Sequence, residues 1–149
     1  MKKILLIIIL ASISIYEAVQ QQKNTSPNNG SSQVKNVNNS SNSLQKAFKN
    51  RRSDFQIQDS GTVIKNLPDD LKGSRHQKFI LKNNTGETVL VAHNIDLAPK
   101  IKSLKEGDRV DFYGEYEWNP RGGVVHWTHN DPKGRHISGW LKHNGKTYQ

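Results

Sequence analysis

The stretch RVDFYGEYEWN, Arg109 to Asn119, carries the clearest secondary-structure signal in the chain, because apolar or small residues alternate with polar ones along it. Successive side chains of a strand point to opposite faces of a sheet. The predicted core face holds Val110, Phe112, Gly114, Tyr116 and Trp118, and the solvent face holds Asp111, Tyr113, Glu115 and Glu117. The stretch therefore predicts an antiparallel strand that is buried on one side only.

The segments before and after this strand predict the remaining elements. A long first strand starts at Phe55 and bends at Gly61, and a hairpin follows over residues 76–82 and 87–93. A short helix is expected from Asp96 as N-cap to its end at Gly107, and a last strand from Val124 to Asn130. This order predicts a mainly β, OB-fold-like five-stranded barrel with one short helix between strands three and four.

Two further elements flank the predicted barrel. Before it, Ser43 can cap a short helix in which Leu44, Ala47 and Phe48 share one face. After it, GWLKHNGKTYQ contains the Asn144-Gly145 pair that favours a two-residue hairpin turn, so a C-terminal hairpin extension is expected. The predicted OB-fold-like domain spans residues 43–149.

The N-terminal residues are expected to lie outside this domain. Residues 1–19 have two lysines followed by an apolar run from Ile4 to Tyr16, which is typical of a signal peptide or a short membrane anchor. Residues 20–42 are rich in Gln, Asn and Ser and predict a disordered linker. We therefore expect an exported protein, periplasmic or secreted, with anchoring to the inner membrane by an uncleaved N-terminal segment as the alternative.

Composition narrows the possible chemistry. The chain has no cysteine, which excludes disulfide partners and thiolate ligands. Its net charge of +9 suggests nucleic-acid binding, but six of the 22 Lys and Arg residues and only one acidic residue lie in the first fifty positions. The predicted domain is therefore only mildly cationic.

Several long phrases resemble one protein family. They are HQKFIL, AHNIDLAPKI, GDRVDFYGEYEWNPRGGVVHWTHNDPKGRH and GWLKHNGKTYQ. Over residues 61–149 the chain resembles domain-of-unknown-function family 3465, a family of short exported bacterial proteins. The resemblance implies no activity, cofactor or set of site residues.

The stretch VVHWTHNDPKGRHISGW, Val124 to Trp140, holds three of the six histidines. On a regular strand His126 and His129 point to opposite sides and cannot readily share a metal. Asp131-Pro132-Lys133-Gly134 follows the preferences of a type I turn, so Asp131 is interpreted first as a turn residue. If this turn closes a hairpin, His129 opposes His136 beside Trp127.

Three functions remain open, and the sequence leaves undecided whether the protein is an enzyme. The first is a binding module for nucleic acid, another polyanion or an oligosaccharide, because OB-folds bind such ligands across strands two and three and neighbouring loops. Lys78 is better explained by a solvated strand face than by a phosphate contact. The candidate ligand-binding residues are Lys72, Arg75, Lys78, Tyr113, Arg121, Trp127 and Arg135.

The second function is a metal-dependent hydrolase or nuclease. His129 and His136, joined by His93 or Asp131, are the candidate ligands of a divalent metal, with zinc as the candidate ion. Against this stands the absence of any known metal-binding spacing. The third function is a protein–protein interaction or envelope structural role, in which the three tryptophans would contact a partner.

Overall fold

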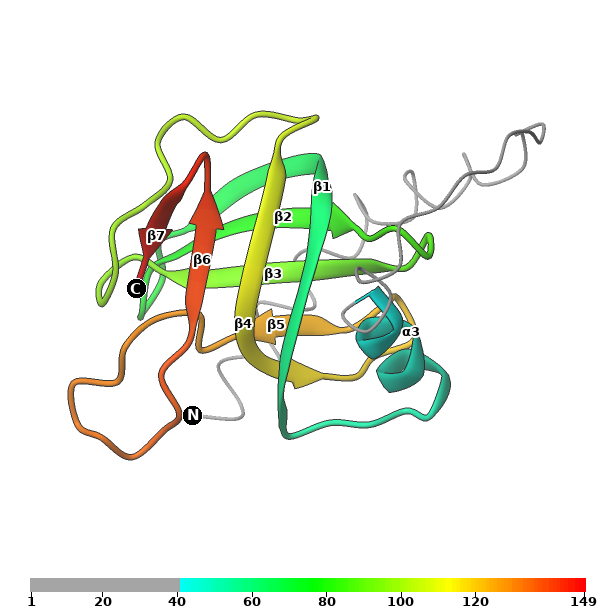
Figure 1. Cartoon of the computed structure of the whole chain (residues 1–149). Helices are drawn as coiled ribbons and strands as arrows, with labels where there is room; N and C mark the ends of the chain where they lie inside the picture. The colour runs from blue at the N-terminus through cyan, green and yellow to red at the C-terminus, as the bar shows by residue number, and fades with distance from the viewer. Residues whose placement is uncertain (1–40) are drawn as a thin grey trace. The chain divides into compact units, whose positions relative to one another are not determined.

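A computed structural model describes residues 41–149 of the protein (Figure 1). The described part is mainly β, as predicted, with seven strands and one short helix. These are α3 (Ser41–Lys49), β1 (Phe55–Asp70), β2 (His76–Lys82), β3 (Thr88–Asn94), β4 (Arg109–Glu117), β5 (Val124–His126), β6 (Trp140–His143) and β7 (Lys146–Tyr148). The predicted signal or anchor, and nearly all of the predicted linker, lie outside the described residues. Within residues 41–149 no helix has the length and apolar character needed to span a membrane.

The strands form one sheet in which the long strand β1 has two partners. The order is β1-β2-β3-β5-β4-β6-β7, and β1 pairs with β4 as well as with β2. Its first half, Phe55 to Thr62, pairs with β4, and its second half pairs with β2. The run β1-β2-β3-β5-β4 therefore returns to β1 through hydrogen-bonded pairs. Gly61 lies where the partners change, and a Cβ there would sit 2.8 Å from the Lys82 carbonyl oxygen.

The alternation predicted for β4 is present in the structure. Val110, Phe112 and Tyr116 are fully buried in the main hydrophobic core. Glu115 and Glu117, from the other face of the strand, are only half-buried. Full burial of an aliphatic or aromatic side chain stabilises a fold by roughly 1.5–3 kcal/mol relative to exposure. The inner face of β4 therefore contributes to the core, and the side chains of its outer face are not needed for core packing.

The predicted helix at Ser43 is confirmed, although it begins at Ser41. Leu44 and Ala47 are buried against the core, and α3 packs on β1. The Trp118 indole Nε1 donates to the carbonyl oxygen of Phe48 at 3.1 Å, which satisfies an acceptor in the last turn of the helix.

The predicted helix between strands three and four is wrong, because residues 95–108 form turns. The Asp96 carboxylate accepts from the N–H and Nε of Arg75, at 2.7 and 2.6 Å, and so does not cap a helix. Further along, the side-chain amide of Gln77 bonds both the N–H and the carbonyl of Ile101, at 2.9 and 3.0 Å. These bonds take backbone groups that a helix would need for itself.

A tight turn joins β4 to β5. Asn119 Oδ1 accepts from the N–H groups of Arg121 and Gly123, at 2.9 and 3.2 Å, and Gly122 N–H donates to the Asn119 carbonyl at 3.2 Å. Gly123 has φ 86°, and a Cβ there would lie 2.4 Å from the ring of Tyr116. Backbone conformation and packing therefore both demand glycine at this position.

The C-terminal hairpin is confirmed. β6 and β7 pair antiparallel across Asn144 and Gly145, whose φ angles of 48° and 77° have the sign that a type I′ turn requires. β6 also pairs with β4, so the hairpin extends the sheet.

Candidate metal centre

The loop after β5 does not form the predicted hairpin. The strand ends at His126 rather than Asn130, because Trp127 adopts φ 53°. A left-handed conformation costs a non-glycine residue about 1–3 kcal/mol and interrupts strand alternation. His129 pairs through its carbonyl with Gly139 N–H at 2.9 Å, not with His136. The predicted register of His129 opposite His136 is therefore wrong.

The turn within this loop confirms the structural interpretation of Asp131. Gly134 N–H donates to the Asp131 carbonyl at 3.0 Å. The Asp131 carboxylate accepts backbone N–H bonds from Lys133 (2.9 Å), Arg135 (2.7 Å) and His136 (2.9 Å). These bonds, that of Lys133 foremost, hold the pKa of Asp131 below its ordinary value. The carboxylate serves the turn.

His93 is engaged at both ring nitrogens. It is fully buried, with Nδ1 2.8 Å from Thr128 Oγ1 and Nε2 3.3 Å from the Pro99 carbonyl oxygen. Burial lowers the pKa of His93 to about 4, so the ring is neutral at pH 7. Nε2 then donates to Pro99 and Nδ1 accepts from Thr128, which leaves no lone pair for a metal.

His129 and His136 both contact one indole ring, that of Trp127. The Trp127 ring stacks on His136 with centroids 4.0 Å apart and planes 6° apart, and lies 5.3 Å from His129. His129 Nδ1 lies 2.7 Å from the Asn130 carbonyl oxygen, to which it must donate. His93, His129, His136 and Asp131 thus each have other contacts, and the structure does not gather them into one ligand set.

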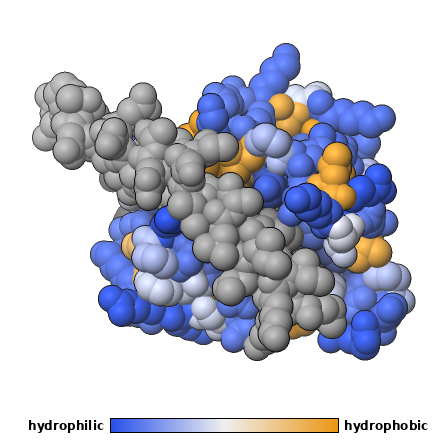
Figure 2. All heavy atoms as spheres, turned by 180° about the vertical axis from the view of Figure 1, so that it is seen from behind, coloured by the Kyte–Doolittle hydropathy of each residue, from blue (hydrophilic) through white to orange (hydrophobic). Residues whose placement is uncertain are grey.

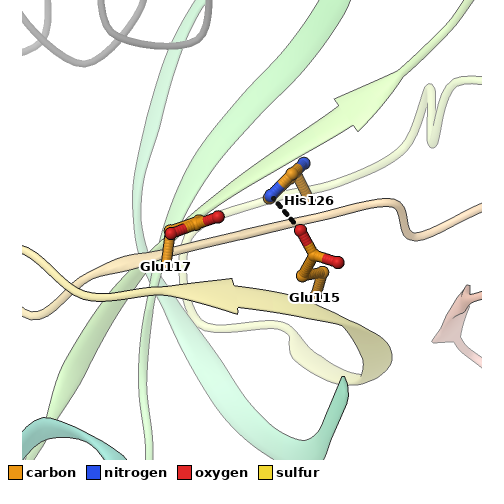
Figure 3. Close-up of side chains that lie close together, drawn as sticks. All are labelled: Glu115, Glu117 and His126. Atoms are coloured by element: carbon orange, nitrogen blue, oxygen red, sulfur yellow. Dashed lines mark ion pairs between the residues drawn. The ribbon is translucent and has the colours of Figure 1, made fainter. Parts of the chain in front are cut away.

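A different group of side chains does converge, on the outer face of β4 and β5. Glu115 and Glu117 are two residues apart on β4, so both point outward, and His126 is the antiparallel partner of Glu115 on β5. One donor atom from each of the three lies within 4.8 Å of the other two. The three side chains point toward one another in Figure 3. We call this group the β4–β5 cluster.

His126 presents an unused nitrogen to the cluster. Its Nε2 is buried and has no hydrogen-bond partner in the described part of the chain. The atom lies 3.4 Å from Glu115 Oε1, near enough for an ion pair but without the geometry of a hydrogen bond. Burial, followed by the charges of His136, His76 and His129, lowers the pKa of His126 to about 4. The ring is therefore neutral at pH 7, which is the form that binds metals.

Glu117 is an acid whose surroundings oppose its charge. Burial, then a side-chain hydrogen bond to Asp54, then the charges of Asp54 and Glu115, raise the pKa of Glu117 to about 7. Asp54 itself has φ 59°, a left-handed conformation that is strained for a non-glycine residue. Carboxyl groups in contact must share a proton or a cation, because both cannot be ionised at low cost.

Glu115 is held by a histidine outside the cluster. His136 Nε2 lies 2.7 Å from Glu115 Oε2, and its Nδ1 lies 3.1 Å from the Ile137 carbonyl oxygen. The Trp127 stack fixes the plane of this ring. Glu115 therefore keeps Oε1 for the cluster while Oε2 is bound, which is how supporting residues orient metal-ligating carboxylates.

Comparison with known proteins gives a family but no activity. No curated protein matches the chain. Residues 29–149 match the model of a family described as "Protein of unknown function (DUF3465)". The chain belongs to the DUF3465 family. The resemblance noted over residues 61–149 is thereby confirmed and extends further toward the N-terminus.

The basic residues predicted to bind a polyanion occupy several environments in this DUF3465 protein. Lys72 and Arg135 are exposed, but Arg75 is paired with Asp96 at 2.6 Å and Lys78 is buried. The face of β2 and β3 that carries Lys78 is apolar, with Ile80, Leu90 and Ala92 buried beside it.

Of the other candidates, Trp127 stacks on His136 as described above, and two more lie on β4 and in the turn after it. Tyr113 packs against Trp140 with ring centroids 6.3 Å apart, and Arg121 is half-buried in the turn between β4 and β5. Tyr113 and Arg121 lie on different elements from the other four candidates, which are Lys72, Arg75, Lys78 and Arg135.

Sequence reasoning missed Glu115, Glu117, His126 and Asp54 as site residues. A signal for the two glutamates existed, since they lie two residues apart on the solvent face of the same predicted strand. For His126 the strand pattern shows only that its side chain points away from that of His129, and it does not show that Glu115 is its partner. Asp54 comes just before β1 and carries no motif, and only the pairing of Phe55 with Tyr116 brings it near Glu117.

Proposed function

We propose that this DUF3465 protein binds one divalent transition metal of the zinc class through Glu115, Glu117 and His126. The observation that carries the proposal is the convergence of two carboxylates and a neutral imidazole within 4.8 Å of one another. Each supplies a donor atom that zinc accepts in proteins. A bound cation would give His126 Nε2 a partner, and it would offset the repulsion between the Glu117 and Asp54 carboxylates.

The donor set favours zinc-like ions over magnesium or calcium. Mg²⁺ and Ca²⁺ prefer oxygen ligands alone, whereas imidazole suits zinc, copper, nickel and iron. Three protein ligands leave a position for water, as in catalytic zinc sites, and Asp54 is near enough to Glu117 to act as a further ligand or as a base. This open position supports the hydrolase hypothesis, which we transfer from His129 and His136 to the β4–β5 cluster.

The direct test is zinc titration of the untagged full chain after removal of metal with a chelator. We expect one equivalent to bind by calorimetry and elemental analysis. His126→Ala should weaken binding by at least about 100-fold, since loss of a supporting residue alone costs 10–100-fold. His143→Ala is the matched control, because His143 is buried and paired with Asp108 outside the cluster. Unchanged binding in His126→Ala, or binding lost only in His129→Ala, would reject the β4–β5 cluster as the site.

We further propose that the closed run β1-β2-β3-β5-β4 is an OB-type barrel. Its support is the pairing of β1 with both β2 and β4 and the parallel pairing of β3 with β5. This order matches a five-stranded Greek-key barrel, with the hairpin of β6 and β7 added to β4. The helix between strands three and four is not part of the proposal. Amide-to-amide contacts between Ile57 and Gly114 in solution would test it.

Export and polyanion binding remain proposals that rest on the sequence. N-terminal sequencing of the protein from its native host distinguishes a cleaved signal from a retained anchor. For a nucleic acid or other polyanion, the exposed Lys72 is the residue with most to contribute, and binding should weaken with salt and in Lys72→Glu. Absence of binding at low salt would remove this function.

A further inference from the structure

The exposed large hydrophobic side chains of the described part of the chain lie on three loops. They are Leu71, Leu97 and Ile137, with 67%, 43% and 57% of their surface exposed. Leu71 follows β1, Leu97 lies between β3 and β4, and Ile137 lies between β5 and β6. Burial of such side chains is normally favourable, so their exposure on separate loops calls for an explanation.

Strand directions bring the three loops to one end of the sheet. β2 begins where β3 ends, since His76 pairs with Asn94, and β1 ends opposite His76. β5 runs parallel to β3, so the loop after β5 leaves in the same direction as the loop after β3 (Figure 1). We call residues 71–75, 95–98 and 127–139 together the loop end.

Hydrogen bonds hold the three loops to one another. The Ile95 N–H donates to the Arg75 carbonyl at 2.9 Å, and Arg75 pairs with Asp96. The bond between His93 and Thr128 ties the start of the third loop to the end of β3. The hydrophobic tips are therefore parts of one structured surface.

Basic residues accompany the hydrophobic tips. Lys72 is adjacent to Leu71, and Lys133 and Arg135 precede Ile137 in the same loop. Within residues 41–149 none of these three basic residues makes an ion pair, whereas Arg75 is paired with Asp96. The loop end thus combines separate apolar tips with three exposed basic side chains, one of which, Arg135, also lies near the Asp131 carboxylate.

We propose that the loop end is a docking surface for a membrane with anionic headgroups. Isolated apolar tips can enter the boundary between headgroups and acyl chains, while Lys72, Lys133 and Arg135 face the lipid phosphates. A protein interface would instead have a contiguous apolar centre. In Figure 2, hydrophobic residues on the visible described surface form separate small patches among hydrophilic ones. The proposal is independent of metal binding.

The absence of cysteine permits a sharp test on the full chain. Single variants Leu71→Cys, Leu97→Cys and Ile137→Cys are labelled with an environment-sensitive fluorophore. Asn84→Cys is the matched control, because Asn84 is exposed in the turn between β2 and β3, at the opposite end of these strands. Labels at the loop end should gain at least about twofold in emission, with a blue shift, when phosphatidylglycerol vesicles are added, because they enter an apolar layer.

The control label and neutral vesicles should give no such change. A second pair of variants tests the charge: Lys133→Glu in the Ile137→Cys background should lower the response, and Lys142→Glu, at an exposed position of β6, should not. No change at any loop-end label overturns the proposal, even where the chain sediments with vesicles through its N-terminal residues. An equal change at Asn84→Cys overturns it as well.

Discussion

Two groupings of histidine with carboxylate lie at the two ends of strand β4, and they differ in how fully their polar atoms are paired. At its start, Asp108 Oδ2 lies 2.8 Å from His143 Nε2 and accepts the Lys105 N–H at 2.9 Å. The Lys105 N–H, followed by His143, lowers the pKa of Asp108. In the β4–β5 cluster, by contrast, Glu117 has a raised pKa and His126 Nε2 has no hydrogen bond. The first grouping is complete in itself, whereas the second would be completed by the cation that we propose.

The largest expected difference between the two groupings is in their response to metal. Zinc that binds only the folded state should raise the free energy of unfolding by about 2.7 kcal/mol at a free concentration 100 times its Kd. The gain should disappear in the Glu115→Gln, Glu117→Gln double variant and persist in His143→Ala. Urea denaturation with and without zinc measures it. An equal gain in the double variant would place the zinc elsewhere.

The two groupings should also differ, by a smaller amount, in the free energy of unfolding that is lost when His143 or His126 is replaced by leucine. His143→Leu removes a bond that a buried ring makes to a carboxylate, and should lower the free energy of unfolding by roughly 2 kcal/mol. His126→Leu removes a buried nitrogen that bonds nothing, so without metal it should change stability by less than about 1 kcal/mol, in either direction. Equal losses in the two variants would show that His126 is satisfied in the metal-free protein.

A third difference concerns the dependence of stability on pH without metal. The pKa of Glu117 is about 7 in the folded state against 4.5 ordinarily, so the folded state holds more protons. The contribution of this group to stability therefore falls as pH rises from about 4.5 to about 7. The pKa of His126, about 4 against 6.5, has the opposite effect, and its contribution rises from about pH 4 to about 6.5.

Glu117→Gln removes the first of these opposing contributions and leaves the second. Between about pH 4.5 and 6.5 the variant should therefore gain stability with rising pH more steeply than the unaltered protein. Urea denaturation across this range measures both slopes. Parallel slopes would mean that Glu117 ionises normally and that its contact with Asp54 does not hold a proton.

The sequence predicted best where local pattern and burial agree. The alternation of β4, the hairpin of β2 and β3, the helix beginning near Ser43 and the Asn144-Gly145 turn are all present. Each depends on neighbours in sequence, through side-chain periodicity or turn chemistry. The helix expected from Asp96 failed because Arg75 and Gln77, about twenty positions away, bind the groups that the helix would use.

The prediction of the metal ligands was wrong for a similar reason. It assumed that the strand carrying His126 continues regularly to Asn130, and a single left-handed residue, Trp127, ends it. The residues that do converge belong to two strands whose pairing is set by the length of the turn between them. Periodicity shows which face a side chain occupies, but neither pairing partners nor an aromatic residue in a left-handed conformation can be read from it.

The length of the turn from Asn119 to Gly123 also determines how the proposed site responds to insertions in the gene. Because this turn sets His126 opposite Glu115, one codon inserted within it would shift β5 by a position and turn His126 toward the core and Val125 toward the glutamates. A point mutation removes at most one donor side chain from the cluster. A single insertion here would abolish it in one step, with every ligand still encoded.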